Sequence, residues 1–129
     1  MTAKAKPTSA ELEILGVLWD HNPATVREVH DLLNKRKPTK YTTVLKFLQI
    51  MHEKGLVKRD EKAKAHVYRP VQTQQQTQKT LVGDLLDRAF RGSALKLVQH
   101  VLETKPASRE EIAEIRRIIS EVEAKGEGK

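Results

Sequence analysis

The chain has 129 residues, enough for one ordinary domain or for a small domain with an appended association module. It has no cysteine, which excludes disulfides, thiolate metal sites and cysteine nucleophiles. The formal net charge is +7, and residues 1–71 carry 14 Lys/Arg against 8 Asp/Glu, whereas residues 72–129 carry 10 against 9. This asymmetry suggests an N-terminal module that faces a polyanion, with a lysine-rich solvated surface as the alternative.

The beginning of the chain, MTAKAKPTS, lacks the apolar stretch of a signal peptide. No later run approaches the roughly 18 apolar residues of a membrane span. We therefore expect a cytoplasmic protein without membrane insertion.

Three capping boxes stand directly before apolar runs with helical spacing, each a Thr or Ser followed three residues later by Glu. The pattern predicts helices over 9–21, from 26 to about 35, and from 109 to about 125. The capping pairs are Thr8 with Glu11, Thr25 with Glu28, and Ser108 with Glu111.

The stretch KPTKYTTVLKF, residues 37–47, is rich in aromatic and β-branched residues, as strands are. Its apolar residues nevertheless recur at every third or fourth position, which predicts a helix over about 40–54 that ends at Gly55. The apolar positions are Tyr41, Val44, Leu45, Leu48 and Met51. The opposite face then presents Thr42, Thr43, Lys46 and Gln49, with Lys40 at its edge.

Two short strand-like runs, LVKRD and HVYRPV, flank the basic segment EKAKA. They predict a hairpin, and the absence of an Asn-Gly or Asp-Gly pair predicts a loop longer than two residues. Pro70, near the end of the second strand, is expected at an edge position.

The glutamine-rich stretch VQTQQQTQKT, residues 71–80, is expected to separate two domains, residues 1–71 and 72–129. Either Thr73 or Thr77 starts the next helix, which ends near Gly92, and a further helix covers about 94–103. Fewer than sixty residues cannot easily bury the apolar faces of these C-terminal helices alone, so we expect a second copy of the chain to cover them. The candidate dimerisation residues are Leu81, Leu85, Leu86, Phe90, Leu95, Val98, Val101, Leu102, Ile112, Ile115 and Ile119.

Catalytic motifs are scarce. The five histidines form neither a His-x-x-x-His pair nor a His-Glu-x-x-His motif, and the sequence has no Gly-rich phosphate loop and no Gly-x-Ser-x-Gly elbow. His30 and His100 lie beside apolar stripes, where a structural histidine is more common than a ligand. We therefore expect no catalytic site, no metal site and no cofactor.

The predicted elements follow the order of a winged helix-turn-helix: two helices, a turn with proline, a third helix and a hairpin with a basic tip. The expected fold is therefore mainly α with a small β-hairpin wing, followed by a C-terminal helical dimerisation region. An α-helix fits the major groove of double-stranded DNA, where Thr, Gln and Lys reach base edges while flanking Lys and Arg meet phosphates. The candidate DNA-binding residues are Lys37, Thr39, Lys40, Tyr41, Thr42, Thr43, Lys46, Gln49, Arg59, Lys62, Lys64 and Arg69.

These residues also have plainer interpretations. Lys46 and Gln49 are good helix formers for any solvent-exposed face, and the ring of Tyr41 fits the apolar stripe while its hydroxyl is placed for a phosphate. The rival function is a winged-helix adaptor that contacts proteins and does not bind DNA specifically. A hydrolase is a distant third, and a repressor controlled by a small molecule stays open because no ligand pocket can be read from the sequence.

Three segments, SAELEILGVLWDHNPATVREVHDLL, YTTVLKFLQIMHEKGLVKR and HVYRPV, resemble the penicillinase repressor family of the BlaI and MecI type, from about Ser9 to Val122. The resemblance implies a homodimeric repressor with an N-terminal winged helix and a C-terminal dimerisation region. It implies a palindromic operator of TACA/TGTA half-sites and control of resistance or stress-response genes. It also implies a sensor-linked protease as a further partner.

The chain departs from the family's pattern at three places. Lys46 and Ile50 stand where the family usually has Thr and Arg, so the base preference is expected to differ. The Cys-x-Cys pair of copper-responsive relatives is missing, which argues against copper sensing of that kind. The Asn-Phe bond that the protease cuts in lactam-responsive members aligns with His100 and Val101.

Overall fold

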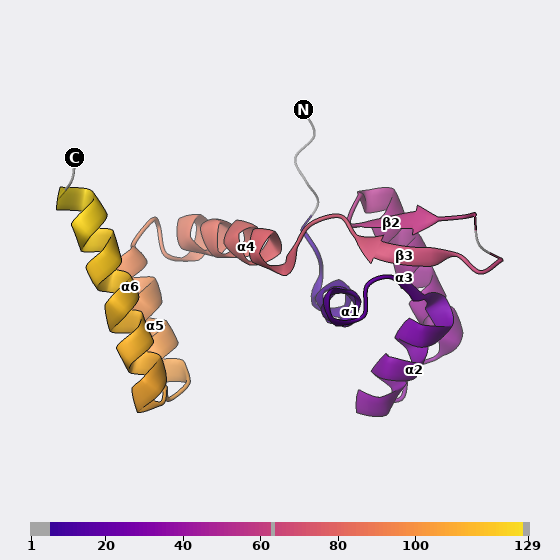
Figure 1. Cartoon of the computed structure of the whole chain (residues 1–129), viewed down its shortest axis with the longest axis horizontal. Coiled ribbons are helices and arrows are strands. Elements are labelled where there is room, and N and C mark those ends of the chain that lie inside the picture. The colour runs from indigo at the N-terminus through magenta and orange to yellow at the C-terminus, as the bar shows by residue number, and fades with distance from the viewer. Residues whose placement is uncertain (1–5, 63, 128–129) are drawn as a thin grey trace. The chain divides into compact units, whose positions relative to one another are not determined.

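The computed structural model describes residues 6–62 and 64–127, which form six helices and one small antiparallel sheet (Figure 1). The first helices are α1 (Ser9–Asp20), α2 (Val26–Arg36) and α3 (Tyr41–Lys54). The strands are β1 (Ala24–Thr25), β2 (Val57–Asp60) and β3 (Val67–Pro70). This order confirms the expected winged helix-turn-helix, and each predicted helix in this part ends within one residue of its observed bounds.

The capping boxes explain where the helices start. Thr8 and Thr25 each accept a hydrogen bond from the backbone N–H three residues on, and the Glu11 and Glu28 carboxylates each accept one from the backbone N–H of the capping threonine. Because both bonds satisfy N–H groups that a helix leaves without partners, α1 and α2 begin sharply.

The sheet differs from the predicted hairpin in having a third strand. Its order is β1-β3-β2, so β3 is the central strand and not an edge. Pro70 nevertheless fits, because it pairs with Val57 of β2 and lies beyond Val67 and Tyr68, the two residues that face β1. β1 was not predicted because two residues are too few to show an alternating pattern.

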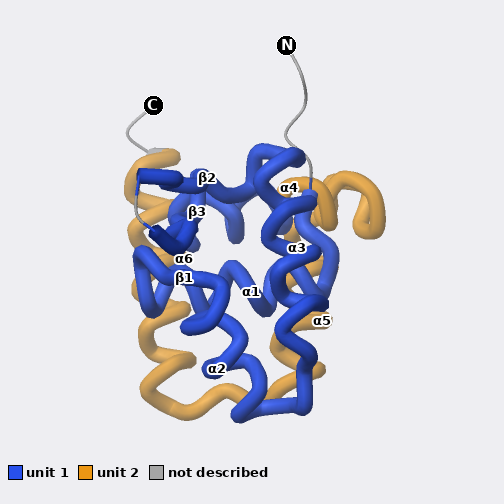
Figure 2. Tube along the Cα trace, turned by 90° about the vertical axis from the view of Figure 1, so that its right-hand side faces the viewer, with its two compact units in different colours: residues 1–82 blue, residues 83–129 orange. Residues whose placement is uncertain are grey.

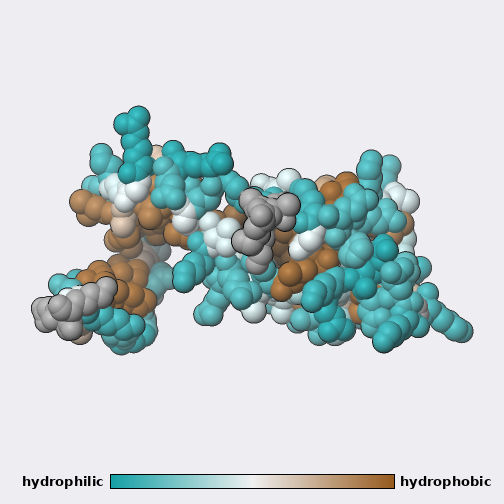
Figure 3. Space-filling view, turned by 90° about the horizontal axis from the view of Figure 1, so that it is seen from above, coloured by the Kyte–Doolittle hydropathy of each residue, from teal (hydrophilic) through white to brown (hydrophobic). Residues whose placement is uncertain are grey.

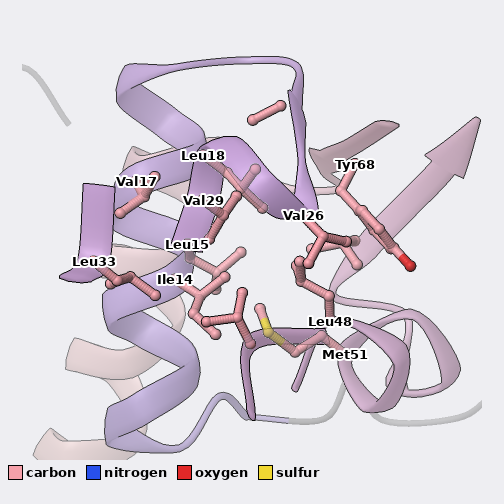
Figure 4. Packing of buried hydrophobic residues seen from close by; sticks show 13 residues of the cluster. Ile14, Leu15, Val17, Leu18, Val26, Val29, Leu33, Leu48, Met51 and Tyr68 are labelled. Atoms are coloured by element: carbon pink, nitrogen blue, oxygen red, sulfur yellow. The ribbon is translucent and has the colours of Figure 1, made fainter. Parts of the chain in front are cut away.

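The core of this part lies where α1, α2, α3 and the sheet meet. Leu18, Val29 and Leu48 are fully buried there, and Figure 4 shows them pointing toward one another with Tyr68 of β3 at one side. The buried residues of α3 are Val44, Leu48 and Met51, which confirms the spacing that predicted a helix in place of a strand. Burying this stripe fixes which face α3 turns outward.

The remaining helices are α4 (Gln74–Ala89), α5 (Ala94–Thr104) and α6 (Arg109–Glu127). Of the two predicted starts, Thr73 is the observed cap of α4, because it exchanges hydrogen bonds with Gln76, while Thr77 is buried inside the helix. The chain divides into two compact units, residues 1–82 and 83–129 (Figure 2). No helix among the described residues has both the length and the apolar character to span a membrane.

Candidate nucleic-acid interface

The turn between α2 and α3 is held by three side-chain hydrogen bonds. Asn34 Oδ1 accepts from the Thr39 N–H at 2.9 Å, and the Thr39 hydroxyl donates to the Lys37 carbonyl at 2.8 Å. His30 Nε2 lies 2.7 Å from the Thr39 carbonyl oxygen, which can only accept, so this nitrogen carries the hydrogen. The angle at which α3 leaves α2 is therefore fixed by local bonds.

One face of α3 is polar, exposed and free of acidic side chains over its first two and a half turns. Four predicted contact residues share this face, opposite the buried stripe. Threonine and glutamine offer hydrogen-bond donors and acceptors, and lysine adds a positive charge, which is the chemistry that reads base edges in a major groove. These four residues are Thr42, Thr43, Lys46 and Gln49.

Cations gather at the start of α3 and at the end of α2. Residues 32–52 contain five Lys/Arg and no Asp or Glu, and all five are exposed. Lys40 is the N-cap of α3 but forms no side-chain capping bond, so its ammonium group is not used to start the helix. The positive ends of these side chains and the helix N-terminus favour an anion beside this turn.

Tyr41 is 41% exposed and has two neighbours from α2. The guanidinium of Arg27 lies 5.9 Å from the centre of its ring, and the ring of His30 meets it edge-on at 5.8 Å. The sequence did not single out Arg27, because a contact between residues fourteen positions apart has no periodic signal. His30, expected to be structural, is engaged with the turn and with Tyr41.

Three of the predicted wing cations are exposed, namely Lys62, Lys64 and Arg69. Arg59, also predicted to contact DNA, is half-buried, and its Nη2 lies 3.6 Å from Glu61 Oε1. The pKa of Arg59 is raised, mainly by a side-chain hydrogen bond with Tyr68, which is its partner on the neighbouring strand. Arg59 is therefore partly engaged within the hairpin, whereas the other three face solvent. Ala63 lies outside the described residues.

An ion pair between a buried carboxylate and a partly exposed ammonium joins α1 to the far end of α3. Glu11 is 2% exposed, and both its carboxylate oxygens lie 2.9 Å from Lys54 Nζ. Burial would raise the pKa of Glu11, but the Thr8 backbone N–H and the Lys54 ammonium outweigh it, so the pKa is lowered. The sequence indicated only the capping role of Glu11, because the pairing with a residue 43 positions away requires the fold.

The predicted dimerisation residues lie on helices that bury little. None of the described residues between 83 and 126 is buried, and Figure 3 shows open hydrophobic surface on these helices. Figure 2 shows α5 and α6 well separated from each other within their unit. The exposed members of the predicted set are Leu85, Leu95, Val98, Val101, Leu102 and Ile119. The half-buried members are Leu81, Leu86, Phe90, Ile112 and Ile115.

Known proteins are similar in sequence to nearly the whole chain. The sequence profile of the family described as "Penicillinase repressor" matches residues 7–121. The transcriptional regulator BlaI of Mycobacterium tuberculosis is 34% identical over 116 residues, which cover 88% of this chain and 83% of that protein. The penicillinase repressor of Bacillus licheniformis is 27% identical over 114 residues, covering 88% and 89%.

A solved structure matches a little over half of the chain. The solution structure of the DNA-binding domain of the repressor BlaI superposes with a TM-score of 0.51 and 26% sequence identity. The match covers 57% of this chain and 90% of that domain.

Proposed function

We propose a function from one premise, which is that the chain belongs to the penicillinase repressor family. The protein is a DNA-binding transcriptional repressor, and no enzyme activity is proposed for it. The observation that carries this function is the outward face of the first two and a half turns of α3, where hydroxyl, amide and ammonium groups lie together without a carboxylate. A protein-binding adaptor has no comparable observation in its favour.

Sequence reading is assigned to α3. A helix enters the major groove with exposed side chains toward the base edges, and Thr42, Thr43 and Lys46 lie on the exposed face of its first half. The two threonines are short, which allows the helix backbone to approach the groove floor. Lys46 is long and charged, and its preferred partner is the O6 and N7 pair of guanine. The base preference of this chain is therefore expected to depend on Lys46.

Phosphate contacts are assigned to the cations around α3. Lys37 and Lys40 flank its start, and Lys62, Lys64 and Arg69 lie on the wing. These contacts position the protein but carry little sequence information, and each releases counterions from DNA. Binding should therefore weaken steeply as salt rises.

Homodimerisation is assigned to the C-terminal helices, with residues 1–71 as the DNA-binding domain and 72–129 as the dimerisation domain. The support is the apolar side chains that the single chain leaves exposed, such as Leu95 at 77% and Val101 at 57%. Two copies related by a two-fold axis would place two α3 helices on a palindromic operator, about 34–36 Å or a multiple apart. Occupation of that site blocks transcription.

Release from DNA would follow separation of the two copies, since each half-site contact is weak alone. His100 and Val101, where the family resemblance places a protease site, are both exposed on α5. Cutting there would remove α6 and part of α5 from the chain. We therefore include a sensor-linked protease as a proposed partner, acting in the cytoplasm where the DNA is.

A binding titration tests the function. A labelled duplex is recovered from a random pool by selection on the full chain, and fluorescence anisotropy is measured on it and on a scrambled duplex, at 50 and 200 mM salt. We expect the selected duplex to bind at least about 10³-fold more tightly than the scrambled one. Raising the salt concentration should weaken binding to both duplexes by a large factor. Failure to bind either duplex at 50 mM salt would reject the proposal and favour a protein adaptor.

A further inference from the structure

A groove lies between the first turn of α2, the start of α3 and the return of the wing. Its volume is about 360 Å³, and its wall includes the cationic or hydrogen-bonding side chains of Arg27, Lys64 and His66. The rings of Tyr41 and of the buried Tyr68 also line it. None of the described residues that line the groove is acidic. The groove therefore favours an anion, and its aromatic lining excludes part of the surrounding water.

Arg27 is the lining residue that the sequence did not single out. It is exposed, and among the described residues no carboxylate forms an ion pair with it. Its contact is with the face of Tyr41, at 5.9 Å from the guanidinium carbon to the ring centre. An arginine stacked on a ring keeps all of its N–H donors for another partner.

A series of contacts fixes the ring on which Arg27 rests. Tyr41 meets the edge of His30 at an interplanar angle of 73°, and His30 Nε2 donates to the Thr39 carbonyl of the turn. The position of the guanidinium is thus set by the same turn that sets the direction of α3. Contact with the ring restricts the conformations of the Arg27 side chain, so less conformational entropy is lost when it binds a ligand.

We propose that Arg27 binds a backbone phosphate of the operator DNA in this groove, and that Tyr41 positions it. This inference rests on the proposed function and adds a contact to it. Arg27 forms two parallel N–H···O bonds to the phosphate, and Lys64, which also lines the groove, supplies a second charge. Since Tyr41 is the first residue of α3, the phosphate lies beside the half-site that α3 reads. The contact sets the register of the helix in the groove.

The test measures affinity and its salt dependence for Arg27→Ala and Arg27→Lys, with anisotropy on the selected and scrambled duplexes. We expect Arg27→Ala to weaken binding to both duplexes by about tenfold or more, and to lower the salt slope by about one per subunit. Arg27→Lys keeps the positive charge but cannot form two parallel hydrogen bonds to one phosphate. It should therefore keep the salt slope and lose part of the DNA affinity. Arg116→Ala, an exposed arginine of α6, is the matched control and should change neither quantity.

The role of Tyr41 is tested with double-mutant cycles that measure DNA affinity. Tyr41→Phe keeps the ring, so the loss of affinity caused by Arg27→Ala should be the same in this background. In a Tyr41→Leu background, the loss of affinity caused by Arg27→Ala should be several-fold smaller. Circular dichroism melts confirm that each variant is folded. If Arg27→Ala matches Arg116→Ala in affinity and slope while the wild type still binds DNA, the phosphate site is wrong and the proposed function stands. If the wild type does not bind DNA, both fail.

Discussion

Lys46 and Lys64 carry the same charge but lie on elements that meet DNA differently. Lys46 is on the outward face of α3, and Lys64 is in the loop of the wing. A side chain that reaches a base edge contributes to the preference for one DNA sequence over another. A side chain that reaches a phosphate contributes to the affinity for every DNA sequence. The two lysines are therefore a matched pair of probes for the orientation of the domain on DNA.

Lys46→Ala is expected to cost about 1 to 3 kcal/mol of binding free energy on the selected duplex and to relax base preference at one position per half-site. Anisotropy on duplexes substituted at each position measures both effects. Lys64→Ala, the control, should weaken all duplexes alike and reduce the salt slope by about one per subunit. Unchanged affinity and unchanged preference in Lys46→Ala would show that α3 is not the reading helix.

The Glu11–Lys54 pair makes stability depend on pH. Because the folded pKa of Glu11 lies below its ordinary value of 4.5, its contribution is fully present above that value and is lost as pH falls through the lowered folded pKa. Glu11→Gln should therefore lower the free energy of unfolding by about 1 to 3 kcal/mol at pH 7. It should also flatten the decline in stability below pH 4.5, as measured by urea unfolding across pH.

Glu13→Gln is the control for this change, because Glu13 lies on the same helix and is exposed. It should alter the free energy of unfolding by no more than about 0.5 kcal/mol at any pH in the series. Equal pH profiles for the two variants would mean that Glu11 does not carry the acid sensitivity.

At the scale of elements, the end of α3 depends on Gly55. This residue has φ +83°, and the N–H groups of Gly55 and Leu56 bond back to the His52 and Met51 carbonyls. A Cβ at Gly55 would meet nothing within 4 Å, so only the backbone conformation opposes a larger side chain. Gly55→Ala should then lower the free energy of unfolding by about 1 to 2 kcal/mol.

Gly16 separates this backbone effect from packing. A Cβ there also meets nothing within 4 Å, but Gly16 lies inside α1 with ordinary helical dihedrals. Gly16→Ala should therefore stabilise the chain, by about 0.5 to 1 kcal/mol in thermal or urea unfolding. A loss of stability in both variants would contradict the assignment of the Gly55 effect to its positive φ.

Helices were the most predictable elements because their signals are local. Each signal involves residues only three or four positions apart, as in the capping pair of Thr25 with Glu28 and the spacing of Val44, Leu48 and Met51. β1 had no such signal, since two residues cannot show a period. The choice between Thr73 and Thr77 as the start of α4 depends on the hydrogen bonds between Thr73 and Gln76.

The candidate site was predictable only in part, for the same reason. The outward face of α3 follows from its buried face, so Thr42, Thr43 and Lys46 could be named from the sequence. Arg27 against Tyr41 and Glu11 with Lys54 could not, because each pair joins separate helices. The partial engagement of Arg59 by Tyr68 also depends on the hairpin's register.

At the scale of the whole molecule, the apolar faces of the C-terminal helices predict an association equilibrium. Leu95 is 77% exposed in the single chain, so Leu95→Glu should cost little within one chain but should oppose burial against a second copy. Sedimentation equilibrium should show Leu95→Glu shifted toward monomer at concentrations where the wild type is dimeric.

Gln99→Glu adds the same charge on the same helix, where Gln99 is exposed and outside the apolar stripe. It should leave the dimer intact. If Leu95→Glu dimerises as tightly as Gln99→Glu, this face of α5 is not the interface.

Two copies of this chain are proposed to read one two-fold DNA site. The most direct measurement compares the selected palindrome with a duplex of equal length in which one half-site is scrambled, with stoichiometry from analytical ultracentrifugation. We predict two chains on each palindrome and an affinity that falls by more than about a hundredfold on the single half-site. Equal affinity for the two duplexes, or one chain bound to the full palindrome, would show that the chain does not read a two-fold site as a dimer.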